Sequence, residues 1–117
     1  MIEIKGYEEL YKQLWENKDS DQVMMLYFGT SWCGPCQQLK EKINTEKEHL
    51  KDLTMLYIDC DEQDNEDIVN DWNITSLPTQ IFVTLKGENV VKNSKIEGYD
   101  WTKFQMEYNK IIENKSD

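Results

Sequence analysis

The amino-acid sequence predicts an α/β domain built around a mixed central sheet. Two near-continuous apolar runs of strand length, residues 22–30 and 53–60, indicate strands buried on both faces. Segments with helical spacing of apolar residues alternate with these runs, which predicts parallel strands joined by right-handed crossovers. Near the C-terminus, two strand-like segments flank the turn-forming residues 86–89, which predicts an antiparallel hairpin.

The remaining elements follow from the spacing of apolar side chains along the chain. Residues 3–5 fit a short edge strand, and residues 80–85 and 89–96 fit the two strands of the hairpin. Helices are expected where apolar residues recur every three or four positions, at residues 7–17, 34–50, 65–73 and 101–114. Five strands and four flanking helices result, and the last three residues are expected to fray.

The length and the charge limit the possible functions. A chain of 117 residues suits one domain, taken here as residues 1–117. The net charge is −10 and all 13 basic residues are lysine, so nucleic acid and anionic membranes would be repelled. No apolar run reaches the roughly 18 residues that a membrane-spanning helix needs.

The N-terminus and the cysteine count both favour a cytoplasmic location. Residues 1–9 lack the basic and then apolar pattern of a signal peptide. Three cysteines are an odd and sparse set, unlike the disulfide framework of a small secreted domain.

The most informative feature is the segment Trp32-Cys33-Gly34-Pro35-Cys36. It follows a predicted buried strand and opens a predicted helix, which brings both sulfur atoms to one face within reach of a disulfide. A helix N-terminus offers free N–H groups and the positive end of the helix dipole, which stabilise a thiolate. A stabilised thiolate is the nucleophile of thiol–disulfide exchange, so the segment predicts redox chemistry.

Two other interpretations of the cysteine pair are weaker. The cysteines could be buried core residues, but the surrounding Trp, Gly and Pro would then lack a reason. A zinc site needs four ligands, and Cys60 and His49 are the side chains left to complete one.

The chain resembles the thioredoxin family over nearly its whole length. The resemblance includes the motif Trp32 to Cys36, preceded by Phe28-Gly29-Thr30-Ser31. Tyr57-Ile58-Asp59 matches the end of the family's third strand, and Ser76-Leu77-Pro78-Thr79 matches its cis-proline loop. Lys86-Gly87-Glu88 and Gly98 match two later glycine positions.

This resemblance implies the thioredoxin fold and a substrate groove. It implies a cis bond before Pro78, whose loop lies beside the cysteines, and backbone pairing between Leu77 and an extended stretch of substrate. The residues expected to line the groove around Cys33 are Trp32, Gly34, Pro35, Leu77, Pro78 and Gly98.

The resemblance also implies a protein-disulfide reductase whose redox disulfide is Cys33–Cys36. Cys33 is expected to attack a protein disulfide and Cys36 to resolve the mixed disulfide, with no metal and no organic cofactor. Electrons are expected from a thioredoxin reductase-type donor, and the chain is expected to be a monomer. A disulfide oxidase or isomerase, or a binding subunit with secondary redox chemistry, remains an alternative.

The sequence departs from the family pattern near the motif. Tyr27 stands where thioredoxins usually carry a buried Asp, and Met55 stands where they carry its Lys partner. Because either charge would be costly when buried alone, their joint loss is consistent. Cys36 is therefore expected to lack a carboxylate base and to use water or the Tyr27 hydroxyl. Gly29 and Glu41 replace a common Trp and a helix-kinking Pro.

Several other residues are expected to be structural. Cys60 lies within an acidic segment, residues 59–71, which holds seven acids and no base. The negative charge of this segment disfavours the thiolate of Cys60. His49 fits a solvated helix end. Trp15, Trp72 and Trp101 are expected in the core. The acidic segment is expected near the active-site edge, where it would favour basic partners.

Overall fold

The computed structural model describes residues 1–115; residues 116 and 117, part of the end expected to fray, lie outside this range. The helices α1 to α4 and the 3₁₀ helices η1 and η2 alternate with five strands, in the order β1 (Ile2–Ile4), α1 (Gly6–Glu16), β2 (Val23–Gly29), α2 (Gly34–Thr45), η1 (Lys47–Leu50), β3 (Leu53–Asp59), η2 (Gln63–Asn65), α3 (Glu66–Asp71), β4 (Thr79–Lys86), β5 (Asn89–Glu97) and α4 (Trp101–Lys115).

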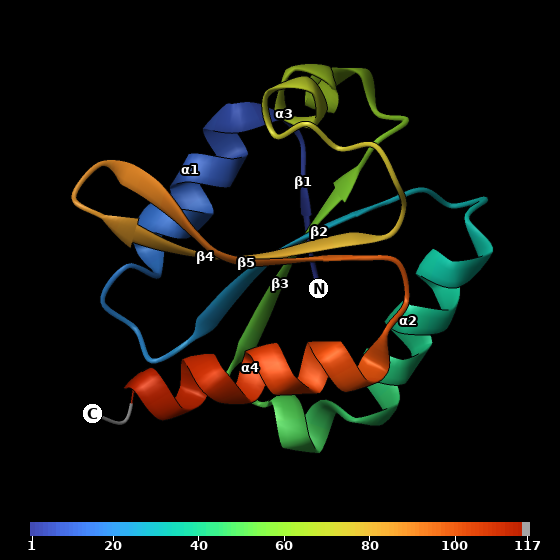
Figure 1. Cartoon of the computed structure of the whole chain (residues 1–117). Coiled ribbons are helices and arrows are strands. Elements are labelled where there is room, and N and C mark those ends of the chain that lie inside the picture. The colour runs from blue at the N-terminus through green and yellow to red at the C-terminus, as the bar shows by residue number, and fades with distance from the viewer. Residues whose placement is uncertain (116–117) are drawn as a thin grey trace.

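The five strands form one mixed sheet in the order β1-β3-β2-β4-β5. The strands β1, β3 and β2 are parallel, and β4 and β5 form the antiparallel hairpin. Figure 1 shows α1 and α3 on one face of this sheet and α2 and α4 on the other. The predicted fold class, a thioredoxin fold with four helices, is confirmed.

The central strand β2 supplies side chains to both faces, because successive residues of a strand point in opposite directions. Met25 and Tyr27 lie in the cluster that includes Leu39 of α2 and Phe104 of α4. Leu26 and Phe28 join the cluster that receives α1 and α3. All seven residues of β2 are buried, as its continuous apolar sequence predicted.

Two helical predictions need correction. The helix expected over residues 34–50 ends at Thr45, and a separate 3₁₀ turn, Lys47–Leu50, follows it. Trp15 is not a core residue, since it is 51% exposed. The apolar stripe of α1 is narrow and consists of Leu10 and Leu14, so Trp15 points outward, where the Lys18 ammonium lies 3.5 Å from its ring centroid.

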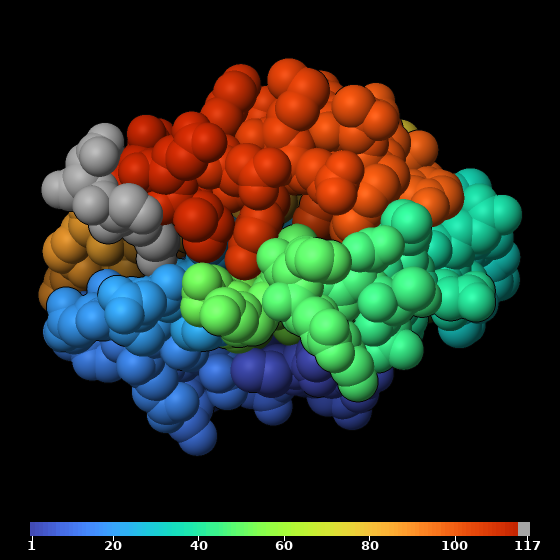
Figure 2. All heavy atoms as spheres, turned by 90° about the horizontal axis from the view of Figure 1, so that it is seen from below, coloured from blue at the N-terminus to red at the C-terminus, as the bar shows by residue number. Residues whose placement is uncertain are grey.

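The two other tryptophans pack as expected, partly buried against the two core clusters: Trp72 against one and Trp101 against the other. Seen from below in Figure 2, α4 forms the upper part of the face and lies beside η1 and the start of β3. Within residues 1–115, the helices are too short or too polar to cross a membrane.

Candidate functional site

The two cysteines of the motif lie where the chain leaves β2 and enters α2. Cys33 is the N-cap residue of α2, and Cys36 lies in the first turn. The two form a disulfide, with Cα atoms 5.2 Å apart. Cys33 is 7% exposed and Cys36 is 1% exposed, so Cys33 is the more accessible of the two.

The start of α2 is arranged around the sulfur of Cys33. The backbone N–H of Cys36 donates a hydrogen bond to the Cys33 Sγ at 3.2 Å. Pro35 lies in the first turn, where its missing N–H costs no intrahelical hydrogen bond. A backbone donor and the helix N-terminus therefore both face the sulfur that would carry negative charge in the reduced protein.

The loop before the disulfide is held by the carbonyl oxygen of Thr30. That oxygen accepts hydrogen bonds from the Cys33 N–H at 3.4 Å and from the Gln37 Nε2 at 3.2 Å. Gln37 was not predicted as a site residue, because a glutamine in a polar helical stretch has no distinguishing pattern. It connects the first turn of α2 back to the end of β2.

Trp32 is the most exposed aromatic residue beside the pair, with 71% of its surface accessible. Its indole Nε1 donates a hydrogen bond of 2.6 Å to the Asp61 carboxylate. Asp61 lies in the loop after β3, and the parallel register of Gly29 with Asp59 brings this loop next to the motif. Sequence reasoning placed the acidic segment near this edge but missed the specific contact.

The cis-proline loop lies at the same edge of the sheet. The Leu77–Pro78 bond is cis, and β4 begins directly after it with Thr79 opposite Phe28. The Gly98 N–H donates to the Pro78 carbonyl at 2.7 Å. Figure 1 shows the connections after β2, before β4 and after β5 on the same side as the start of α2.

Gly98 follows β5 and is held by residues around the start of β4. Its φ of +85° lies in the region that favours glycine, and its carbonyl accepts a hydrogen bond of 3.3 Å from the Gln80 Nε2. Gln80 is fully buried, and the register places it directly opposite Tyr27. No sequence pattern indicated this role, because a polar residue in an apolar strand has several explanations.

The side chain of Tyr27 lies fully buried below the start of α2, and its hydroxyl donates a hydrogen bond to the carbonyl oxygen of Cys36. Its ring packs against Tyr57, with centroids 5.8 Å apart. Burial, and then the Tyr57 phenol, raise the pKa of Tyr27 above its usual range. The hydroxyl is therefore a neutral donor, and the expected use of Tyr27 as a base gains no support.

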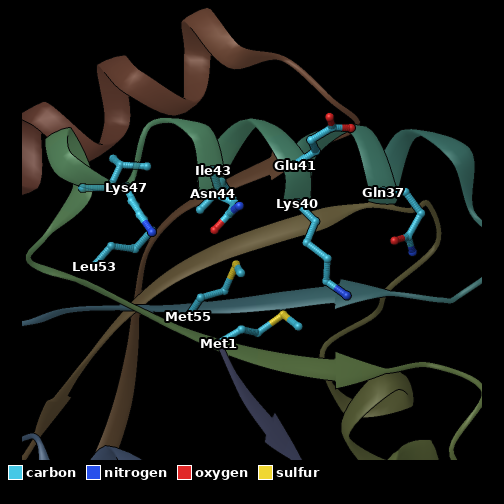
Figure 3. A pocket seen from close by; sticks show the side chains of 10 residues that line it. Met1, Gln37, Lys40, Glu41, Ile43, Asn44, Lys47, Leu53 and Met55 are labelled. Carbon is cyan, nitrogen blue, oxygen red and sulfur yellow. The ribbon is translucent and has the colours of Figure 1, made fainter.

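Met55 lies on the floor of a groove of about 660 Å³ between α2 and β3. Figure 3 shows Met55 beneath α2, with Lys40 and Lys47 extending from the helix side. Neither cysteine lines this groove, and Met55 belongs to the same buried cluster as Tyr27.

Cys60 is the one free cysteine among the described residues, and it is half-buried. Burial, and then the carboxylates of Asp59 and Asp61, raise the pKa of its thiol to about 11. The sequence predicted a disfavoured thiolate from the acids, whereas burial is the larger cause. His49 is largely exposed beside Glu46, and residues 1–115 contain no group of three acidic, His or Cys side chains that could hold a metal.

The family model of thioredoxin matches residues 6–110. Thioredoxin H2 of Arabidopsis thaliana is 31% identical over 58% of this chain and 50% of its own length. Thioredoxin-T of Drosophila melanogaster is 36% identical over 62% of this chain and 44% of its own length. The chain thus spans about half the length, or less, of these curated relatives.

Solved structures agree with this match. A poplar thioredoxin h has a TM-score of 0.79 and 25% identity, and the alignment covers 95% of each chain. Thioredoxin O1 of Arabidopsis thaliana in its oxidised state has a TM-score of 0.72 and 28% identity, covering 90% of this chain and 91% of its own. The chain belongs to the thioredoxin family, and its Cys33–Cys36 pair is consistent with a Cys-x-x-Cys active site.

Proposed function

We propose that this protein is a protein-disulfide reductase whose working group is the Cys33–Cys36 dithiol. The observation that carries the proposal is the placement of the pair at the start of α2, with Cys33 the more exposed of the two. The helix N-terminus and the Cys36 N–H both favour a thiolate at Cys33 over one at a solvent-exposed cysteine.

The reaction starts from the reduced dithiol. The Cys33 thiolate attacks one sulfur of a substrate disulfide, the substrate S–S bond breaks, and the other substrate sulfur leaves as a thiolate that takes up a proton. Cys36 then loses its proton and attacks the Cys33 sulfur of the mixed disulfide. The second substrate thiolate leaves, and the two electrons of the dithiol have passed to the substrate.

The substrate groove is proposed to consist of the residues that surround Cys33 at this edge. Support comes from the register, which ends β2 and starts β4 side by side, and from the backbone bond between Gly98 and Pro78. The backbone of Leu77 would pair with an extended substrate segment. The proposed lining is Trp32, Gly34, Pro35, Leu77, Pro78 and Gly98.

The proposed partners follow from the same chemistry. Protein disulfides are the substrates, and a thioredoxin reductase-type donor returns the disulfide to the dithiol. We also propose that residues 1–117 form a single domain that works as a cytoplasmic monomer. The small number of cysteines and the strongly charged surface favour that location and that state.

The reduction potential of the Cys33–Cys36 pair tests the proposal. It is measured by equilibration with defined thiol buffers, followed by mass spectrometry of the trapped protein. A value near the general figure of about −270 mV for thioredoxins is expected for a reductase. A value above about −200 mV would instead indicate a disulfide oxidase or isomerase.

Cysteine variants separate a reductase from a binding subunit. Cys33→Ser is expected to abolish disulfide reduction, because it removes the attacking sulfur. Cys36→Ser is expected to accumulate the mixed disulfide with substrate, because the resolving sulfur is missing. If the double variant retains the cellular function of the protein, its redox chemistry is secondary and the reductase proposal is wrong.

A further inference from the structure

A single side-chain hydrogen bond links β2 to the backbone of the second cysteine. The Tyr27 hydroxyl donates to the carbonyl oxygen of Cys36, and both residues are almost fully buried. Within a helix, that carbonyl already faces the N–H of the residue four positions later, so the hydroxyl uses its second lone pair. The first turn of α2 is thereby attached to the strand beneath it.

The surroundings of Tyr27 are shaped to hold its ring under the disulfide. A methyl group added at Gly29 would lie 3.2 Å from the Tyr27 Cε1 atom and 3.3 Å from the Cys36 Sγ. The ring and the sulfur therefore meet over Gly29, two residues further along the same face of β2. On the β3 side the ring packs against Tyr57. These contacts leave the ring little freedom to move, so the direction of its hydroxyl is fixed.

The phenols and the amide around Tyr27 are neutral at physiological pH, and a lysine ammonium lies beside one of the phenols. Tyr57 of β3 faces it, and burial raises the pKa of that phenol to about 12. Gln80 of β4 lies opposite, and Tyr108 of α4 belongs to the same cluster with a pKa also raised by burial. The Lys40 ammonium of α2 lies against the Tyr57 ring, 4.7 Å from its centroid.

The buried residues of the described chain include no carboxylate. The polar ones are Thr30, Asn65, Thr79 and Gln80. Since a protonated phenol does not accept a proton from a thiol at neutral pH, no buried side chain can serve as a base for Cys36.

We propose that Tyr27 is the positioning residue of the redox centre: its hydroxyl fixes the Cys36 backbone for attack on the Cys33 sulfur, and solvent carries the protons. The inference rests on the proposed function. In the resolving step the Cys36 thiol gives its proton to water, and its thiolate forms the bond to Cys33 Sγ. The Cys33–substrate S–S bond breaks, and the substrate thiolate takes a proton from water.

The first test replaces Tyr27 with Phe, which removes the hydroxyl and keeps the ring. Turnover of a disulfide substrate is expected to fall by about three- to tenfold, because small errors in the position of a nucleophile slow a reaction strongly. Tyr57→Phe is the matched control, since it removes the hydroxyl of the neighbouring ring, and it is expected to stay within about twofold of the wild type.

A second measurement separates positioning from a general loss of structure. The alkylation rate of Cys33 is compared in Cys36→Ser and in Tyr27→Phe/Cys36→Ser. The two rates are expected to agree within about twofold, because the Cys36 N–H that faces the Cys33 Sγ belongs to the peptide group before the one whose carbonyl Tyr27 holds. A parallel fall in alkylation and turnover would show a general structural role and would overturn the proposal. Wild-type turnover in Tyr27→Phe would overturn it as well.

The wild-type protein gives a test that needs no variant to fold. Its pH profile of turnover is expected to show thiol ionisations and no buried carboxylic acid between about pH 5 and 8. Tyr27→Asp is expected to add such an ionisation, with a pKa raised by burial. An ionisation in the wild-type profile beyond those of the Cys33 and Cys36 thiols would overturn the proposal. Failure of both the wild type and Tyr57→Phe to reduce disulfides would instead overturn the proposed function.

Discussion

At the residue scale, the packing around Gly29 explains why the family's common Trp is absent there. The ring of Tyr27 and the sulfur of Cys36 occupy the space above it. Gly29→Ala is expected to destabilise the fold by about 1–3 kcal/mol, since overpacking a tight core forces its neighbours to shift. Urea unfolding measures the change.

Gly34 provides the matched control for this substitution. A methyl group there meets no atom within 4 Å, and the residue opens α2 without a positive φ. Gly34→Ala is expected to leave stability unchanged or to raise it by up to about 1 kcal/mol, since it lowers the entropy of the unfolded chain. Equal losses in both variants would contradict the contacts assigned to Gly29.

Cys60 shows how the environment suppresses a thiol's reactivity. Its pKa of about 11 lies above that of an ordinary thiol, so the folded protein keeps it protonated at neutral pH. In Cys33→Ser/Cys36→Ser, alkylation of Cys60 is expected to be slow at pH 7 and to rise only as the pH approaches the raised pKa. Alkylation followed by mass spectrometry measures this profile.

The same variant unfolded in urea is the control for Cys60. Without burial and without the fixed positions of Asp59 and Asp61, the thiol is expected to ionise with the ordinary cysteine pKa of about 8.5. Identical profiles in the folded and unfolded states would show that the site does not protect the thiol.

At the scale of the elements, Asn65 joins the end of β3 to the junction of β1 and α1, whose residues lie 59 to 61 positions before Asn65 in the sequence. Its Oδ1 accepts from the Gly6 N–H at 2.8 Å, and its Nδ2 donates at 3.0 Å to the carbonyl oxygens of Ile4 and Asp59. The residue is fully buried and satisfies backbone groups at the ends of β1 and β3 and at the start of α1.

Loss of these bonds is expected to be costly. Asn65→Ala removes three hydrogen bonds of a buried side chain, while the Asp59 carbonyl keeps a second donor, the Glu62 N–H. The variant is expected to destabilise the fold by about 2–4 kcal/mol. Asn70→Ala is the matched control, because Asn70 is exposed in the adjacent helix and is expected to change stability by less than about 0.5 kcal/mol. Urea unfolding of both variants measures the difference, and equal effects would refute this role of Asn65.

Sequence patterns predicted the elements better than the contacts between them. The apolar run of β2 and the motif at Cys33 were informative because burial on both faces and helix capping leave marks in adjacent residues. Asn65 left no such mark, since its partners come from segments up to 61 residues away. The exposure of Trp15 was missed because helical spacing does not fix the width of a buried stripe.

At the scale of the whole molecule, the fold concentrates negative charge beside the redox pair. The parallel pairing of β2 and β3 sets Asp59 next to Gly29, so the acidic segment of residues 59–71 begins at the edge that carries Cys33. The hydrogen bond from the Trp32 indole to the Asp61 carboxylate lies where the acidic segment meets this edge. An acidic field at this edge is expected to attract substrates with basic residues near their disulfide.

Two peptides with the same disulfide loop, one flanked by lysines and one by glutamates, test this field. At low ionic strength the lysine peptide is expected to be reduced severalfold faster. Salt is expected to remove most of this difference, since the screening length falls from about 30 Å at 0.01 M to about 3 Å at 1 M. The rate constants are measured by stopped flow.

A pair of double variants locates the effect on the molecule. Asp64→Asn/Asp67→Asn removes two charges from the acidic segment, and it is expected to lower the preference for the lysine peptide. Asp19→Asn/Asp21→Asn removes two exposed charges before β2, at the opposite end of the strand from Cys33. Seven strand residues span about 23 Å, more than the screening length of about 10 Å at 0.1 M salt. The second variant is therefore expected to keep the wild-type preference, and equal losses in both would show that net charge alone steers the substrate.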